Sequence, residues 1–125
     1  MPIHWFGKTP NDGNASLYIS NITLNKVASE PLNSAYKVQV GIDDNKNVVI
    51  KPLSKNQVER GDIPIDTVFD YQVKKSYSRI CSSVLMKDIA SSCSLTLSKE
   101  PLKLKTEWKS SDGLLIIETN MKGVD

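Results

Sequence analysis

The stretch YKVQVGIDDNKNVVIK, residues 36–51, decides the fold. Positions 36, 38, 40 and 42 are aromatic or aliphatic and alternate with lysine, glutamine and glycine, the period-two spacing of a strand with one buried face. The polar cluster at 43–46 predicts a turn, and the apolar run at 48–50 predicts the returning strand. We therefore expect a β-hairpin here, closed by Pro52.

A second hairpin is predicted over residues 102–119. Every second residue from 102 to 108 is apolar or threonine, with lysine or glutamate between them. The sequence SSDG at 110–113 follows, and Asp-Gly is a strong hairpin signal. The chain thus carries two hairpins of similar design, about 65 residues apart.

Each hairpin is preceded by a predicted strand and a short capped helix. In the first half, the strand spans 16–24 with an interruption near Ser20-Asn21, and Asn25 caps a helix over 26–33 that Pro31 keeps short. In the second half, a strand spans 67–75 and 77–80 extends it or pairs beside it. Ser82 or Ser83 then caps an amphipathic helix over 84–92.

This order of elements suggests one domain with an internal duplication. The expected segments are a lead-in (1–14), a first unit (16–53), a connector (54–66) with one helical turn, a second unit (67–119) and a tail (120–125). The expected counterparts are Ile22 with Ile80, Ala28 with Ala90, Val40 with Trp108, and Ile50 with Ile117.

The predicted fold class is mainly β with two short helices (β or α+β). A strand–helix–hairpin unit of about 40 residues cannot close a core alone. Two units can do so if each hairpin pairs with strands of the other unit. We therefore expect a compact barrel built from two strand–helix–hairpin units, with pseudo-twofold symmetry.

Composition narrows the class of protein. The 125 residues include 16 basic and 14 acidic side chains, a net charge of +2, which argues against a strongly basic domain but leaves room for a local basic face. No apolar run approaches the roughly 20 residues that cross a bilayer, and the N-terminus lacks the pattern of a signal peptide. We expect a cytoplasmic protein without membrane contact, with Cys81 and Cys93 reduced.

No motif for catalysis, cofactor binding or metal binding is found. Nucleophile elbows, phosphate loops and dinucleotide fingerprints are absent, and His4 is the single histidine. The acidic turn at 43–45 lacks the spacing of a calcium loop. Asp62, Asp66 and Asp70 read as surface carboxylates. The sequence therefore predicts a protein that is not an enzyme and needs no cofactor.

The first unit resembles the AbrB/MazE/SpoVT family. The resemblance rests on about 30 residues: TLNK at 23–26, Leu32, YKVQV at 36–40 and VVIKPL at 48–53. The second unit follows the pattern weakly, through 78–80 and the strands after Leu102. Asn25 stands where the family has proline, and Ser20-Asn21 replace its Gly-Arg signature.

The resemblance implies a swapped-hairpin barrel, a form usually made from two copies, and a transcriptional regulator or antitoxin-like protein that binds double-stranded DNA. In the family, basic residues near the first strand and helix start contact DNA. Matching positions here are Lys26 and Arg79, and Lys74 and Lys75 complete the expected basic patch. Lys103, Lys105 and Lys109 share one strand face, either as solvated charges or as phosphate contacts.

A second hypothesis is a non-enzymatic protein-interaction module on the same scaffold. The aromatic segment His4-Trp5-Phe6 would then bind a partner protein or a second copy of this chain. The other reading of these residues is packing onto the surface of their own domain. The scarcity of arginine, with only Arg60 and Arg79 present, counts against extensive base reading.

Overall fold

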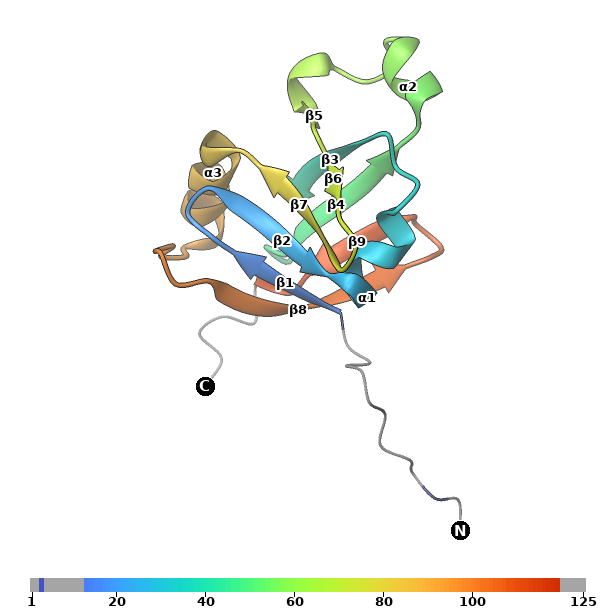
Figure 1. The fold of residues 1–125 in the computed structure, drawn as a ribbon. Coiled ribbons are helices and arrows are strands. Elements are labelled where there is room, and N and C mark those ends of the chain that lie inside the picture. The colour runs from blue at the N-terminus through green and yellow to red at the C-terminus, as the bar shows by residue number, and fades with distance from the viewer. Residues whose placement is uncertain (1–2, 4–12, 120–125) are drawn as a thin grey trace.

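The computed structural model describes residue 3 and residues 13–119. In this part of the chain the mainly-β class with short helices is confirmed (Figure 1). The elements are β1 (Asn14–Leu17), β2 (Asn21–Asn25), α1 (Lys26–Ser29), β3 (Lys37–Ile42), β4 (Val48–Leu53), α2 (Lys55–Glu59), β5 (Val68–Phe69), β6 (Gln72–Val73), β7 (Tyr77–Cys81), α3 (Ser83–Cys93), β8 (Leu102–Lys109) and β9 (Leu114–Ile117). Two 3-10 turns occupy Glu30–Leu32 and Ile65–Thr67.

The described strands form one antiparallel sheet that curls back on itself. Its order is β5-β3-β4-β9-β8-β1-β2-β7-β6. The two ends of this order, β5 and β6, are separated in the chain only by Asp70 and Tyr71. One bent segment therefore pairs with β3 through its first half and with β7 through its second half. It joins the two edges of the sheet, as the predicted barrel requires.

The two hairpins are exchanged between the halves of the chain. The hairpin of β3 and β4 lies between β5 and β9, which both belong to the second half. The hairpin of β8 and β9 lies between β4 and β1, which both belong to the first half. Each unit thus completes the sheet of the other, and the expected interlocking is confirmed.

The strand register tests the expected counterparts. Ile22 and Ile80 are directly paired, so a twofold axis relating the halves passes between them. Val48 pairs with Ile117, and Ile50 pairs with Leu115. If Ile50 and Ile117 are counterparts, the twofold axis exchanges these two pairs, so the register agrees with this expectation.

The other two expected counterparts are wrong. Val40 pairs with Ile50, and Thr106 pairs with Ile117, so the register matches Val40 with Thr106 rather than Trp108. The capping residues Asn25 and Ser82 receive hydrogen bonds from the amides of Ala28 and Leu85. Helix position therefore matches Ala28 with Leu85 rather than Ala90.

Several element boundaries differ from the sequence prediction. The strand expected at 16–24 reverses direction at residues 18–20 and becomes the β1–β2 hairpin. The strand expected at 67–75 breaks at Asp70 and Tyr71 because its two parts serve different neighbours. Helix α1 ends at Ser29 and a 3-10 turn follows through Pro31, while β4 continues through Pro52 to Leu53.

The core lies inside the curled sheet and is closed by helices α1 and α3. Alternate residues of each longer strand point inward, such as Ile22 and Leu24 of β2, which are fully buried. Leu85, Met86 and Ile89 bring one face of α3 onto this core. Helix α2, by contrast, has no buried residue and lies beyond the sheet (Figure 1).

A chain of three hydroxyl groups, two of them buried, holds in place the bent segment 68–73 that joins the two edges of the sheet. The Tyr71 hydroxyl donates to Ser78 Oγ on β7 at 2.8 Å. The Ser78 and Ser29 hydroxyls lie 2.7 Å apart, and Ser29 Oγ donates to the carbonyl of Leu24 at 3.3 Å. Ser29 and Ser78 are buried, so this network supplies their hydrogen bonds where water does not reach. Burial raises the pKa of Tyr71, although the two serine hydroxyls act in the opposite direction.

Removing the Tyr71 hydroxyl should destabilise the fold. We expect Tyr71→Phe to lower the free energy of unfolding by about 0.5–1.5 kcal/mol, because one hydrogen bond to buried Ser78 is lost while the ring remains. Urea denaturation measures the change. Tyr36→Phe is the matched control, since Tyr36 is 43% exposed. Equal effects of the two substitutions would contradict a closing role for Tyr71.

The stability difference between the native protein and Tyr71→Phe should also depend on pH. The folded state holds the Tyr71 pKa above its ordinary value of 10.0, so the unfolded chain loses this proton first as pH rises. The stability from Tyr71 is therefore present below pH 10.0 and is lost as pH rises through the folded pKa. The stability gap between the native protein and Tyr71→Phe should be constant below pH 10 and shrink as pH rises above it. A gap that stays constant as pH rises above 10 would count against this cause.

Candidate nucleic-acid interface

One outward-facing row of polar residues crosses five neighbouring strands. Because Leu17, Ile22 and Ile80 point into the core, the residues that alternate with them face outward. The paired residues of the row, taken strand by strand from β8 through β1, β2 and β7 to β6, are Lys103, Ser16, Thr23, Arg79 and Gln72. A basic side chain thus lies on each side of the polar residues of the β1–β2 hairpin.

A second row runs beside the first toward the start of α1. Lys105 pairs with Asn14, and the amide of Asn14 donates to Asn25 Oδ1 at 3.0 Å. Asn25 in turn pairs with Tyr77 of β7. The amide of Lys74 donates to the carbonyl of Tyr77 and forms the β6–β7 turn. Because Tyr77 pairs with Asn25, this turn lies beside Lys26, the first residue of α1.

Six basic residues lie in these two rows or beside their α1 end, and we name this set the basic face: Lys26, Lys74, Lys75, Arg79, Lys103 and Lys105. None of them forms an ion pair with a residue that the structure describes. Strands β1, β2, β6 and β7 contain no acidic residue. On β8, Glu107 forms an ion pair with Lys109, with 3.4 Å between Oε2 and Nζ. Glu118 lies beside Lys105, since its amide donates to the carbonyl of Lys105 at 2.9 Å, but it forms no ion pair with a described residue. Positive charge on the basic face is therefore not neutralised by ion pairs within the described residues.

Arg79 has an unusual environment within the basic face. Its guanidinium lies over the ring of Tyr77, 5.2 Å from the ring centre. The Nε atom is shielded from solvent and has no acceptor among the described residues. A shielded donor without a partner costs stability, which offsets part of what the contact with Tyr77 contributes. A planar guanidinium with free donors is suited to phosphate or base contacts.

The neighbouring polar side chains have different roles. Asn25 Oδ1 accepts from the amides of Asn14 and Ala28, so this residue caps α1 and ties it to β1. It is therefore structural, at the position where the resembling family has proline. The Thr23 hydroxyl donates to Asn21 Oδ1 at 2.8 Å. Ser16 and Gln72 provide further polar groups in the same row as Arg79.

Of the four basic residues chosen from the sequence, Arg79 lies in the first row, and Lys26, Lys74 and Lys75 lie at the end of the sheet where Asn25 pairs with Tyr77. The structure adds Lys103 and Lys105, whose strand face was recognisable but whose neighbour β1 was not. His4, Trp5 and Phe6 lie outside the described residues. Within the described ranges, no group of three or more histidine, cysteine or acidic residues could hold a metal ion. No helix there has the length and apolar character to cross a membrane.

Comparison of this chain with protein-family models, with curated proteins and with solved structures finds no match. The basic face is therefore defined by its own residues and their strand register.

Arg79 should contribute little to folding. We expect Arg79→Met to change the free energy of unfolding by no more than about 1 kcal/mol, because the lost contact with Tyr77 is offset by removal of the unpartnered Nε donor. Urea denaturation of the variant beside the native protein measures this. A loss of more than about 2 kcal/mol would make Arg79 a structural residue.

Proposed function

We propose that this protein binds double-stranded DNA through the basic face. The observation that carries the proposal is the register of β8, β1, β2 and β7, which aligns Lys103 and Arg79 across Ser16 and Thr23. Lysine, arginine, serine and threonine side chains are the groups that contact phosphate oxygens in most protein–DNA interfaces. The absence of acidic residues from β1, β2, β6 and β7 keeps carboxylate repulsion away from the row that these four strands contribute.

The dimensions of the face suit a duplex. Three strand spacings separate Lys103 on β8 from Arg79 on β7, which gives about 14 Å between their backbones. The major groove of B-DNA is about 12 Å wide. Basic residues at this separation reach phosphates on both sides of one groove, while the β1–β2 hairpin between them faces the groove itself.

The composition of the basic face favours phosphate contacts over base reading. Five of its six charged residues are lysines, which act as point charges, and Arg79 alone offers the planar fork that recognises guanine. We therefore expect affinity that depends strongly on salt and sequence preference that depends mainly on Arg79. The regulatory or antitoxin-like role implied by the resemblance to AbrB-type proteins belongs to the same proposal. Two exchanged hairpins in one chain support it, since that family builds such a barrel from two copies.

A protein-interaction module is the second candidate function. Ile19 in the β1–β2 turn is 56% exposed and Val84 at the start of α3 is 70% exposed. The amide of Ser82 donates to the carbonyl of Ser20 at 3.1 Å, so these apolar residues occur where the turn meets the helix. This end of β2 is opposite to the end that carries Lys26. A partner could bind there without covering the basic face.

DNA binding should fall with salt and with removal of the aligned lysines. We expect a duplex of about 20 base pairs to bind at low salt, with a slope of log affinity against log salt near −0.9 per phosphate contact. Lys103→Ala with Lys105→Ala should make this slope shallower by ~1.8 and weaken binding of all sequences similarly. Fluorescence anisotropy across a salt series measures both quantities.

The matched control replaces Lys87 and Lys99, which are exposed and lie outside the basic face, by alanine. This control removes the same charge from α3 and from the linker before β8. An equal loss of affinity in both double variants would show attraction to net charge rather than to the basic face. Absence of duplex binding by the native protein at low salt would refute the proposed function.

A further inference from the structure

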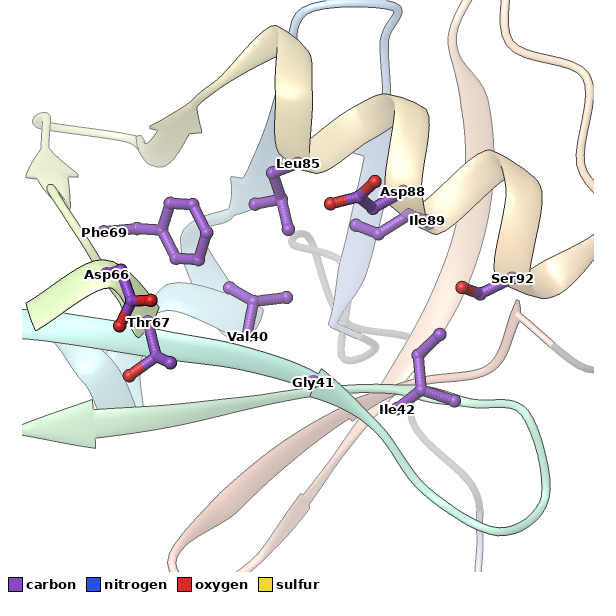
Figure 2. A pocket seen from close by; sticks show the side chains of 10 residues that line it. All are labelled: Val40, Gly41, Ile42, Asp66, Thr67, Phe69, Leu85, Asp88, Ile89 and Ser92. Carbon is purple, nitrogen blue, oxygen red and sulfur yellow. The ribbon is translucent and has the colours of Figure 1, made fainter. Parts of the chain in front are cut away.

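A groove of about 360 Å³ separates helix α3 from strand β3 and the start of β5 (Figure 2). Its apolar lining includes Val40, Phe69, Leu85 and Ile89, contributed by the strands and by the helix. Two carboxylates line the same groove, Asp88 from α3 and Asp66 from the 3-10 turn before β5. Figure 2 shows them on different walls of the groove.

The pseudo-symmetry of the fold explains how the groove arises. Strand register matches Val40 with Thr106 and Phe69 with Ala15, so Thr67 corresponds to Gly13. In the first half this location is filled. The amide of Thr106 donates to the carbonyl of Gly13 at 3.0 Å. A methyl group on Gly13 would lie 2.4 Å from Thr106 Oγ1 and 3.1 Å from Ala28 Cα.

The second half has larger side chains at the same positions. Threonine replaces glycine at 67, leucine replaces alanine at 85, and phenylalanine replaces alanine at 69. These side chains keep α3 away from the backbone of β3, whereas α1 packs directly against Gly13. The groove is therefore a consequence of how the two halves differ, and its walls are held by the sheet and by the buried face of α3.

The charges of the groove have one sign. Its lining contains no lysine, arginine or histidine. Asp66 and Asp88 are exposed, and neither forms an ion pair with a described residue, whereas Asp70 is paired with Lys37 and Asp62 with Arg60. Two unneutralised carboxylates beside an apolar floor attract a cation and repel phosphate. The groove is thus opposite in charge to the basic face.

We propose that this groove binds a small organic cation, an ammonium or guanidinium group carried on an aliphatic or aromatic body. The apolar body would occupy the floor between Phe69, Leu85 and Val40, and the cation would lie between Asp66 and Asp88. The volume falls within the range of small-molecule sites, which combine apolar walls with a few polar groups that orient the ligand. This site is separate from the proposed DNA interface and does not depend on it.

The test compares tryptamine with indole-3-propionate, which share an aromatic body and carry opposite charges. We expect tryptamine to shift backbone amide resonances of residues 40–42 and 85–92 in a two-dimensional NMR titration, and to bind at least about fivefold more tightly than indole-3-propionate. Asp88→Asn and Asp66→Asn should each weaken tryptamine binding by about threefold. The double variant should bind the two probes with similar affinity.

Asp112→Asn is the matched control, because Asp112 is an exposed carboxylate in the β8–β9 turn and does not line the groove. It should leave tryptamine affinity unchanged. Equal binding of the two probes by the native protein would overturn the proposal, as would shifts confined to other residues. Binding of a lysine-rich peptide without binding of tryptamine would replace the small cation by a protein partner and would also overturn it.

Discussion

The pairing of β4 with β9 is the constraint on which the rest of the structure depends. It joins residues nearly 70 positions apart, with Val48 opposite Ile117 and Ile50 opposite Leu115, and all four side chains are buried. Thr119 secures the pairing, since its hydroxyl donates to the carbonyl of Lys46 and accepts from the amide of Val48. Once the inner strands of the two hairpins are joined, the outer strands β3 and β8 must find partners in the opposite half. The alignment of β8 with β1 follows from this exchange.

The sequence predicted elements well because period and capping are local properties. The alternation over 36–51, the Asp112-Gly113 turn and the caps Asn25 and Ser82 all depend on residues near in sequence. Pairing partners are not local. A period-two pattern is unchanged when a strand slips by two residues, which is why Trp108 was matched with Val40 in place of Thr106. The break at Asp70 and Tyr71 was also invisible, because it arises from two distant neighbours, β3 and β7.

The candidate sites also combine local features, which the sequence shows, with non-local ones, which it does not. Lysine and arginine positions can be read from the sequence, so it predicts four residues of the basic face. Lys103 needed the pairing of β8 with β1, which no pattern in the sequence encodes. The segment around Asp66 indicates only an isolated surface carboxylate. Asp66 gains neighbours because the fold brings Asp88 and Leu85 of helix α3 to the same groove.

Hairpin exchange also explains how one small chain can carry two surfaces of opposite charge. The core uses only the inward residues of each strand, so the outward residues of β1, β2 and β7 are free to be polar or basic without cost to the interior. The two halves also differ in their helices. One or two side chains set the distance between each helix and the sheet that it covers. Gly13 and Ala28 let α1 pack closely, whereas Thr67 and Leu85 hold α3 apart. Two halves with the same topology therefore differ in how closely their helices pack against the sheet.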